Sequence, residues 1–524
     1  MKTPTISLIL LLILSCSLAA SAAGDFLQCL SEKSDNYSSI SNVVYTSNNS
    51  SYTSILKYSI FNLRFATNST PKPQAIITPE HESQIPAIIH CAKEACLEVR
   101  TRSGGHDFEG LSYVSRVPFV VIDLINLSEI TVDAESKTAW VEAGATIGSL
   151  YYRIAEKSPV LGFPAGGCLT IGVGGHFGGG GYGLMQRKYG LAADHVIDAR
   201  IVDVNGKILD RESMGEDLFW AIRGGGAASF GVVVAWKVQL VDVPKNVTIF
   251  QVDRTLEQNA THLIHRWQYI APNIDKDLFI GVLTSRSSNR TVLVSFFALY
   301  LGGIDTLLPL MQQSFPELGL VRQNCAETSW IQSTLAFGGY PIETPLQILL
   351  NRTQPTKGFA KDKSNYVKTP IPQHAFEGIW EHFYKAEAMS GLFILMMPYG
   401  GKMAEISESA IPFPHRGGNL YLINHAIGWL EENARDSESY VSWSRRIDDY
   451  LTPYVSSNPR EAYLNYRDLD LGVNNVVGET SYEQASVWGK RYFKDNFDRL
   501  VRVKTMVDPG NFFRNEQSIP PLHY

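Results

Sequence analysis

One histidine and one cysteine, each placed directly after a pair of glycines, are the residues of this chain best suited to chemistry. His106 follows Gly104-Gly105, and Cys168, 62 positions further along, follows Gly166-Gly167. Glycine clusters let backbone N–H groups approach a phosphate or a flat ring closely, because no Cβ stands in the way. An imidazole beside one such loop and a thiol beside the other indicate two side chains that converge on one bound ligand.

The motifs of two other classes of nucleotide-binding protein are missing. The sequence has no Walker lysine and no Gly-x-Gly-x-x-Gly motif that opens a βαβ unit. This argues against a P-loop NTPase and against a Rossmann enzyme. A glycine-rich run is weak evidence on its own, and Gly178–Gly181 could be only a flexible turn.

Residues 1–23 have the features of a secretory signal peptide. Lys2 supplies a positive charge, Leu8–Leu14 is an unbroken apolar run, and Ala20–Ala23 offers a small-residue cleavage site. A membrane anchor needs about 18–20 apolar residues, and neither this run nor any later stretch is long enough. We therefore expect a secreted protein of the cell exterior or cell wall, or a vacuolar one, without a membrane partner.

Asn-x-Ser/Thr sequons support this route and predict a glycosylated surface. Their asparagines are Asn36, Asn48, Asn49, Asn68, Asn126, Asn246, Asn259, Asn289 and Asn351.

The cysteine count and the charge exclude several classes of protein. Six cysteines in 524 residues are too few for a disulfide-rich scaffold, and Cys16 belongs to the signal peptide. Five cysteines remain, so at least one has no cysteine partner within the chain. A formal charge of −6 argues against nucleic acid or an anionic membrane as a partner. We expect a monomer with a small-molecule substrate.

Short β-rich runs alternate with helical stretches as far as residue 243, which predicts an α+β fold. Strands are expected at 118–124 and 138–143, a hairpin with an Asn-Gly turn at 199–210, and a helix at 216–222. After residue 243 longer strands alternate with amphipathic helices, and the tail is expected to hold one helix over 482–499. We predict a nucleotide-binding domain over 24–243, a substrate domain over 244–455, and a C-terminal segment over 456–524.

Several long motifs resemble the berberine bridge enzyme-like family of plant flavoproteins. They lie at residues 101–107, 171–183, 406–416 and 463–470, and the C-terminal residues 512–522 are similar to those of the cannabinoid-acid synthases within that family. The resemblance implies a vanillyl-alcohol-oxidase or PCMH-type FAD-binding domain, completed by the C-terminal segment, and an antiparallel-sheet substrate domain. It also implies a disulfide between Cys29 and Cys91, which leaves Cys96 and Cys325 as buried thiols.

The same resemblance implies FAD held by two covalent bonds, one from its 8α-methyl group to His106 and one from C6 to Cys168. Such tethering fixes the isoalloxazine ring and raises its potential, which favours removal of hydride from demanding substrates. The pyrophosphate is expected on backbone N–H groups of the two glycine loops. The expected cofactor-binding residues besides the two tethers are Arg102, Ser103, Gly104, Gly105, Ile171, Gly172, Gly174, Gly175 and Asn465.

Tyr466 matches the position where close relatives carry a tyrosine that acts as a base. A phenol has an ordinary pKa near 10, so it needs a neighbouring cation, and Arg467 could supply one. Tyr113 and Tyr182 match tyrosines that flank the flavin pocket.

The sequence departs from the family pattern in two segments. Asn424 and His425 stand where many members have Gln or Glu followed by Tyr; Asn424 cannot take up a proton, and His425 could replace the lost base. Met397 stands where the cannabinoid-acid synthases have Tyr, which predicts a different substrate pocket. Ile171 lies where the family tunes oxygen access, and its extra methylene over Val predicts restricted access.

The sequence therefore predicts a flavin-dependent oxidase or dehydrogenase that removes hydride from a plant secondary metabolite. The candidate substrates are a prenylated phenol, which could be cyclised oxidatively, an alkaloid, a monolignol or a carbohydrate. Molecular oxygen or another acceptor then reoxidises the flavin. The alternatives are a non-redox cyclase that keeps the flavin as a structural wall, for example for a Diels–Alder-type cycloaddition, and a non-catalytic binding protein.

Overall fold

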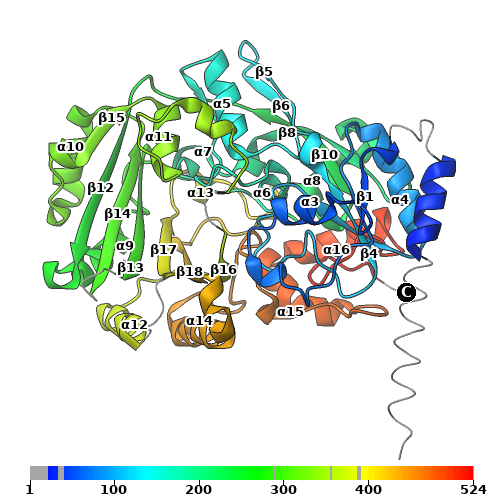
Figure 1. Cartoon of the computed structure of the whole chain (residues 1–524). Helices are drawn as coiled ribbons and strands as arrows, with labels where there is room; N and C mark the ends of the chain where they lie inside the picture. Colours follow the sequence, from blue (N-terminus) through cyan, green and yellow to red (C-terminus); the bar gives the residue numbers. More distant parts are fainter. Residues whose placement is uncertain (1–21, 34–39, 287–290, 355–356, 386–390, 523–524) are drawn as a thin grey trace, which may run out of the picture.

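The computed structural model describes residues 22–33, 40–286, 291–354, 357–385 and 391–522. Helices and mostly antiparallel sheets form an α+β fold, as expected from the sequence. Figure 1 shows a long-stranded sheet on one side and several smaller sheets on the other. The predicted signal peptide lies outside the described residues, apart from its last two positions.

The first half of the chain builds three small sheets. A four-stranded sheet has the order β1-β2-β4-β3, a five-stranded sheet has the order β5-β6-β10-β8-β9, and β11 pairs with β7. The strands are β1 (Val44–Thr46), β2 (Ala75–Ile77), β3 (Glu98–Arg102), β4 (Phe119–Asp123), β5 (Ile130–Asp133), β6 (Thr138–Glu142), β7 (Leu161–Gly162), β8 (Val196–Val202), β9 (Ile208–Leu209), β10 (Val232–Gln239) and β11 (Val241–Asp242).

Most of the predicted elements of this half are present. Strand β4 is buried along its whole length and pairs in parallel with β2 and β3, as suits an unbroken apolar run. Strands β8 and β9 form the hairpin predicted around the Asn-Gly turn. The helices of this half are α3 (Tyr52–Tyr58), α4 (Ile85–Glu94), α5 (Ile147–Lys157), α6 (Val173–Gly178), α7 (Gln186–Tyr189) and α8 (Arg211–Ile222).

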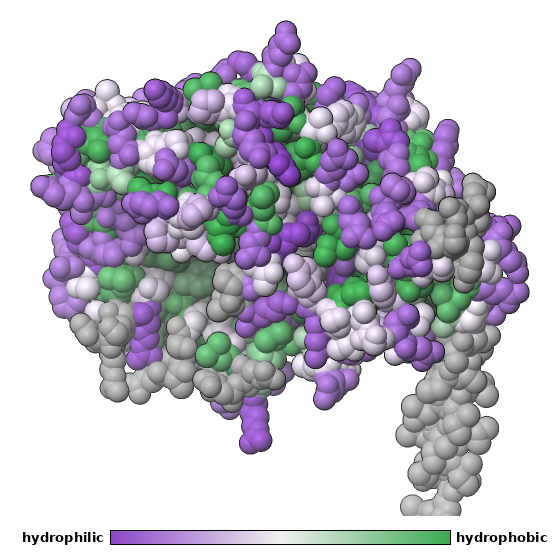
Figure 2. Space-filling model, turned by 45° about the horizontal axis from the view of Figure 1, so that its top comes forward, coloured by the Kyte–Doolittle hydropathy of each residue, from purple (hydrophilic) through white to green (hydrophobic). Residues whose placement is uncertain are grey.

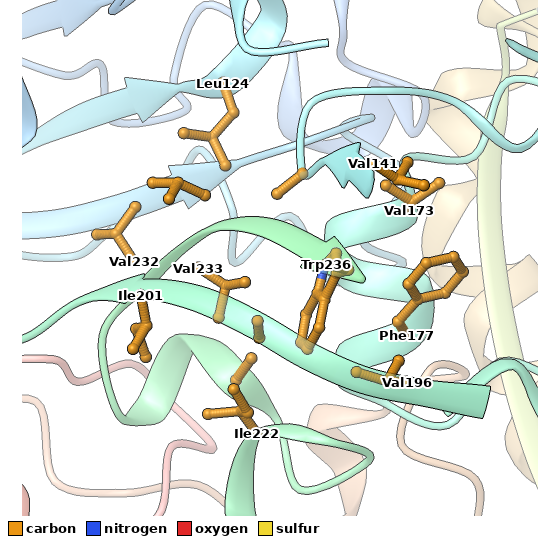
Figure 3. Packing of buried hydrophobic residues seen from close by; sticks show 14 of the residues in the cluster. Leu124, Val141, Val173, Phe177, Val196, Ile201, Ile222, Val232, Val233 and Trp236 are labelled. Carbon is orange, nitrogen blue, oxygen red and sulfur yellow. The ribbon is translucent and has the colours of Figure 1, made fainter. Parts of the chain in front are cut away.

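The short helix α6 is held against the five-stranded sheet by its apolar residues. Figure 3 shows Val173 and Phe177 of α6 beside Val141 and Trp236 of the sheet, and the Phe177 and Trp236 rings are 6.1 Å apart. These residues are all buried in one hydrophobic cluster. The packing fixes the position of the glycine-rich segment that contains and flanks α6.

The middle of the chain forms one seven-stranded antiparallel sheet with the order β15-β12-β14-β13-β17-β18-β16. One face packs on helices through an aromatic cluster that includes Trp267, Trp380 and Trp443. The strands are β12 (Val247–Thr255), β13 (Leu278–Arg286), β14 (Val292–Tyr300), β15 (Cys325–Thr328), β16 (Phe359–Val367), β17 (Gly391–Pro398) and β18 (Tyr421–Trp429), and the helices are α9 (Ala260–Ile270), α10 (Ile304–Ser314), α11 (Trp330–Phe337), α12 (Gln373–Lys385), α13 (Lys402–Glu405) and α14 (Ser437–Leu451).

The C-terminal segment returns to the first half of the molecule, where α16 packs on α8 (Figure 1). The single helix predicted over 482–499 is wrong: the chain forms α15 (Tyr482–Phe493) and α16 (Asn496–Val507). The break falls at Lys494, which has a φ of 49° and therefore cannot continue a right-handed helix. The buried Lys504 amine then ties the tail down, because it donates to the Ser229 and Phe513 carbonyl oxygens.

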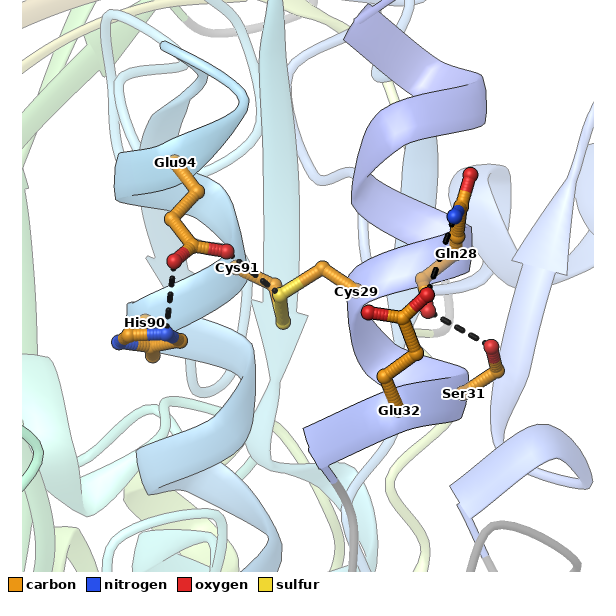
Figure 4. The surroundings of a disulfide bond; sticks show 7 residues. All are labelled: Gln28, Cys29, Ser31, Glu32, His90, Cys91 and Glu94. Carbon is orange, nitrogen blue, oxygen red and sulfur yellow. Dashed lines mark hydrogen bonds and ion pairs between the residues drawn. A yellow bond between two sulfur atoms is a disulfide. The ribbon is translucent and has the colours of Figure 1, made fainter.

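The structure contains the expected disulfide between Cys29, in the helix over 22–33, and Cys91 of α4 (Figure 4). Its Cα atoms are 5.5 Å apart, within the usual range for a disulfide. The prediction that Cys96 and Cys325 are buried is wrong. Cys96 is exposed in the turn after α4, at a φ of 53°, and Cys325 is partly exposed at the start of the edge strand β15.

The face of the molecule in Figure 2 is mainly hydrophilic, with hydrophobic residues in small separate groups. Every predicted sequon asparagine within the described residues is exposed; Asn36 and Asn289 lie outside them. Among the described residues, no helix combines the length and the apolar character needed to cross a bilayer.

Candidate active site

A cavity of about 1010 Å³ lies between the glycine loops of the first half and one face of the seven-stranded sheet. Both tether candidates, His106 and Cys168, line it. Residues of β12, β13, β14 and β17 form the opposite wall, together with Tyr466 from the C-terminal segment. Three parts of the chain that are distant in sequence therefore enclose one space.

His106 is held in one orientation by three neighbours. Its Nε2 atom lies 3.0 Å from Thr170 Oγ1 and 2.6 Å from Gln354 Nε2, and its ring stacks on Phe61 at 4.9 Å. Burial lowers the pKa of His106 to about 4, against a hydrogen bond from Thr170 that opposes the shift. The imidazole is therefore neutral at physiological pH and has a lone pair available for bond formation.

Cys168 faces the cavity from the second glycine loop. Its sulfur is exposed to the cavity, and it lies 3.9 Å from the same Thr170 hydroxyl that contacts His106. Partial desolvation by the surrounding protein raises the pKa of the thiol, while hydrogen bonds from Thr170 and Ile171 oppose this. The two tether candidates thus converge on one hydroxyl, although they are far apart in sequence.

The glycines between them make room for a large cofactor. The backbones of Gly104 and Gly172 approach so closely that a Cβ on Gly104 would stand 2.3 Å from the Gly172 nitrogen. A Cβ on Gly175, which lines the cavity, would meet no atom within 4 Å. The first pair joins the two loops, and Gly175 leaves open space beside the backbone of α6. Neutral His106, Cys168 and this open backbone surface fit FAD.

Most of the other expected cofactor residues lie around the same space. Ser103, Gly105, Ile171 and Gly174 line the cavity, and Ser103 Oγ donates to the Ala143 carbonyl oxygen at 2.5 Å. Asn465 also lines it. The Asn465 amide donates to the His176 carbonyl oxygen at 3.0 Å, so it joins the C-terminal segment to α6.

Arg102 was expected to bind the cofactor, but this is wrong, because its side chain points away from the cavity. The guanidinium is fully buried, binds Asp123 at 2.6 Å and donates to the carbonyl oxygens of Leu56 and Ile55 at 2.7 and 3.0 Å. It therefore supports the first glycine loop from behind.

Two of the predicted catalytic tyrosines meet in the cavity. The hydroxyls of Tyr182 and Tyr466 share a short hydrogen bond, and both residues pack in one cluster with Tyr463. Burial raises the pKa of both phenols well above the ordinary value. Arg467 was expected to lower the Tyr466 pKa, but this is wrong: its guanidinium lies 3.7 Å from Asp107 and donates to the Gln517 carbonyl oxygen.

Asn424 and His425 occupy opposite faces of β18. Asn424 pairs with Leu395, which lines the cavity, and its amide donates to the Lys363 carbonyl oxygen at 3.1 Å. His425 is the next residue and points to the far side, because successive strand residues alternate. It is fully buried, 4.0 Å from Asp448, and burial lowers its pKa to about 4. His425 therefore does not reach the cavity and cannot act there as a base.

Tyr113 is also displaced from the expected position. It is buried in a small cluster with Tyr52, Leu56 and Phe119, and it does not line the cavity. Its environment indicates a packing role.

Sequence reasoning missed several residues of the site. Thr170, Gln354 and Phe61 orient His106, and Phe297 and Phe337 form the apolar wall. A threonine two positions after the tether cysteine was visible as a local signal. Nothing in the sequence near the other four indicates that they meet His106 or the cavity, because each comes from a distant part of the chain.

Comparisons with known proteins agree with this geometry. Residues 73–211 match the family described as FAD binding domain, and residues 462–520 match the family described as berberine and berberine like. The chain is 56% identical over 519 residues to a tetrahydroberberine oxidase of Berberis wilsoniae, which covers 97% of this chain and 96% of that protein. It is 49% identical to cannabidiolic acid synthase-like 1 of Cannabis sativa, over 95% of this chain and 93% of that protein.

The solved structure of Phl p 4, a grass pollen allergen with glucose dehydrogenase activity, superposes with a TM-score of 0.90 at 45% identity, over 95% of this chain and all of that one. A variant of Phl p 4 with valine in place of one isoleucine is described as a glucose oxidase. These matches confirm the PCMH-type fold and the FAD-binding domain that the motifs predicted. The chain belongs to the berberine bridge enzyme-like family and is an FAD-dependent oxidoreductase.

Proposed function

We propose that this enzyme oxidises a polycyclic aromatic amine of the tetrahydroberberine type, with its FAD bound covalently to His106 and Cys168. The observation that carries the proposal is one cavity that both tether candidates line together with the aromatic residues Phe297 and Phe337. When bound, FAD supplies the acceptor for a hydride. The family membership favours this redox chemistry over the cyclase alternative.

The walls of the chamber favour a flat apolar substrate over a sugar. Phe297, Phe337, Leu395 and Met397 line it, with Tyr182 beside them. A sugar has many hydroxyls that require buried hydrogen-bond partners, whereas an apolar ring system needs only a few polar anchors. The 56% identity to a tetrahydroberberine oxidase supports the same substrate class.

The tyrosine pair suits an amine better than a phenol. A phenol substrate must lose a proton, and a protonated tyrosine with a raised pKa is a poor base for this. A neutral amine needs only correct orientation, because its nitrogen lone pair already assists loss of hydride from the adjacent carbon. The Tyr182 and Tyr466 hydroxyls can orient that nitrogen by hydrogen bonding.

The test is anaerobic absorbance of the holoprotein titrated with tetrahydroberberine, a prenylated phenol, a monolignol and glucose. Bleaching of the oxidised flavin by tetrahydroberberine alone is the expected result. Bleaching by glucose or by the phenol, with none by tetrahydroberberine, would overturn the proposed substrate class. Conversion of any compound without bleaching would instead support the cyclase alternative.

The Tyr466→Phe variant distinguishes a tyrosine that acts as a base from one that only orients the substrate by hydrogen bonding. With the amine substrate we expect the rate of flavin reduction to fall by less than about tenfold, whereas loss of an essential base costs about 10²–10⁴-fold. Stopped-flow reduction by tetrahydroberberine measures the difference, with the exposed Tyr384→Phe as control. A loss in the larger range would assign Tyr466 as a base and argue against simple amine oxidation.

Ile171 is proposed to limit reaction of the reduced flavin with oxygen. It lines the cavity three residues after Cys168. In Phl p 4 the isoleucine and asparagine that were substituted lie five positions apart, the same spacing as Ile171 and His176 here. The Phl p 4 variant that keeps this isoleucine but has histidine at the second position is described as a glucose dehydrogenase.

We therefore expect Ile171→Val to speed reoxidation of the reduced flavin by oxygen by on the order of tenfold, which corresponds to about 1.4 kcal/mol in the barrier. Mixing the reduced enzyme with aerated buffer and following the return of flavin absorbance measures this rate. Ile249→Val, at a cavity position on β12, is the matched control and should leave the rate unchanged. Equal rates for Ile171→Val and wild type would remove Ile171 as the restriction.

Secretion, glycosylation and a monomeric state belong to the same proposal. The exposed sequons support glycosylation along the secretory route. Fractionation of the plant tissue, with a mass decrease on enzymatic deglycosylation, tests the route, and light scattering tests the monomer.

A further inference from the structure

Asp362 places a carboxyl group on the cavity side of the seven-stranded sheet. In this antiparallel sheet Asp362 pairs with Ala426, and Asn424 pairs with Leu395. Paired residues, and residues two apart on one strand, share a face. Because Leu395 lines the cavity, Asp362 and Asn424 lie on the face directed toward it. Asp362 is only 4% exposed, and the Asn424 side chain is a hydrogen-bond partner of its carboxyl group.

The two cations that act electrostatically on Asp362, Lys361 and Arg64, are already paired with other carboxylates. Lys361 binds Glu109 and Asp468 at 2.5 and 2.6 Å, and Arg64 lies 4.0 Å from Glu109. Asp362 takes part in no ion pair among the residues that the structure describes. It is a buried acid without a cation of its own, on the cavity-side face of the sheet and behind the residues that line the chamber.

The surroundings of Asp362 place its ionisation near neutral pH, and its charge acts electrostatically on side chains of the chamber. Burial raises the pKa of Asp362 to about 7, and the negative charge of Glu109 adds to this increase. The hydrogen bond from Asn424 and the positive charges of Lys361 and Arg64 oppose it. Burial raises the pKa of Tyr182 and Tyr466, and the negative charge of Asp362 adds to that increase. The carboxylate is therefore within electrostatic reach of the two phenols that border the substrate.

We propose that Asp362 stabilises positive charge on the substrate in this chamber, so that the site selects amines whose oxidation produces a cation. This inference rests on the proposed function. Hydride leaves the carbon next to nitrogen with both bonding electrons, which pass to the oxidised flavin. The nitrogen lone pair then forms the C=N bond, and the positive charge remains on nitrogen. A nearby carboxylate favours that charge, whereas it does nothing for a neutral product.

The sign of the pH dependence follows from the carboxyl. Above its pKa Asp362 is ionised and attracts a cation; below it the group is neutral and the attraction is lost. By reciprocity a bound cation lowers the pKa of Asp362, and a displacement of about one unit corresponds to about a tenfold change in affinity. A cationic ligand should therefore bind more tightly as the pH rises through about 7.

Calorimetric titration of the oxidised holoprotein with berberine, a permanent isoquinolinium cation, tests this without turnover. The wild-type protein should bind berberine about fivefold more tightly at about pH 8 than at about pH 6, because a one-unit displacement of the pKa reaches its full tenfold effect only over a wider pH range. Asp362→Asn keeps the size and hydrogen-bonding capacity of the side chain, and should bind equally at both pH values with the weaker wild-type affinity. Should Asp362→Asn fold poorly, Asp362→Ser removes the same charge and must give the same result.

Three controls make the result specific to Asp362. The neutral lactam 8-oxoberberine has the same ring skeleton and should bind independently of pH. Asp470→Asn changes a carboxylate bound to Lys363 and Arg445, and Glu109→Gln changes the one bound to Lys361. Asp470→Asn should keep the wild-type pH dependence of berberine binding. Glu109→Gln should keep the size of the pH effect but move its midpoint to lower pH, because the Glu109 charge raises the pKa of Asp362. The proposal is overturned if Asp362→Asn keeps the pH dependence, if 8-oxoberberine shows it too, or if Glu109→Gln abolishes it.

Failure of this inference can be distinguished from failure of the proposed function. If tetrahydroberberine reduces the flavin of the wild-type enzyme but Asp362→Asn binds berberine with unchanged pH dependence, only the role of Asp362 is lost. If tetrahydroberberine does not reduce the flavin, the proposed substrate class is wrong, and the proposed selection for amines falls with it.

Discussion

Replacing both His106 and Cys168 by alanine is expected to release the flavin completely when the protein is denatured, whereas each single variant should retain it. The two side chains reach the cavity from separate loops and both contact the Thr170 hydroxyl, so either bond can form without the other. The yellow colour and fluorescence of the acid-precipitated protein, separated from the supernatant, measure retention. Loss of tethering should also slow flavin reduction by up to about 10²-fold, the usual cost of a misplaced reacting group.

The matched control replaces a histidine and a cysteine that lie outside the cavity. His90 and Cys96 are both exposed, and His90→Ala with Cys96→Ala should leave the flavin attached and the rate unchanged. Flavin retained by the double variant at the tether positions would mean that another residue forms the bond. Flavin lost from His106→Ala alone would mean that Cys168 cannot react without the first bond.

Arg102→Met is expected to lower the free energy of unfolding by about 3–5 kcal/mol, although Arg102 does not touch the cavity. The substitution leaves the Asp123 carboxylate buried at 1% exposure without its cation, and it removes two hydrogen bonds to backbone carbonyl oxygens. Ser103 directly follows Arg102, so we also expect less FAD per protein molecule. Thermal and denaturant unfolding measure stability, and the ratio of flavin to protein absorbance measures loading.

Two further variants test the reason for this loss. Arg153→Met removes an exposed ion pair with Glu156 and should change stability by about 1 kcal/mol or less. Arg102→Met combined with Asp123→Leu removes both buried charges and should recover most of the stability, because the main penalty comes from the unpaired carboxylate. A single Arg102→Met variant as stable as the wild type would show that the ion pair does not support the loop.

Local sequence signals predicted the structural features that depend on residues close together in the chain, such as single strands, turns and glycine loops. The apolar run at 118–124 became a buried strand, and the Asn-Gly pair became a hairpin turn. The glycine pairs marked the two loops that carry His106 and Cys168. Such features depend on backbone freedom, hydrophobic periodicity and turn chemistry, all of which act over a few residues. The motifs also indicated the family, which the comparisons confirmed.

Tertiary structure decided which side chains meet. Asn424 and His425 are adjacent in sequence, yet the pleat directs one toward the cavity and the other to a buried face against α14, and no local signal indicated which. Arg467 follows Tyr466 but turns to Asp107.

Nothing in the sequence around Asp362 indicated a buried acid, because its burial and its lack of an ion-pair partner among the described residues depend on how β16, β18 and the glycine loops pack together. By itself, the sequence determined most of the elements, the two glycine loops and the cofactor class, but not the break between α15 and α16. Long-range packing determined the orientation of His106, the surroundings of the tyrosines and the position of the buried acid, since each depends on contacts between residues that are far apart along the chain.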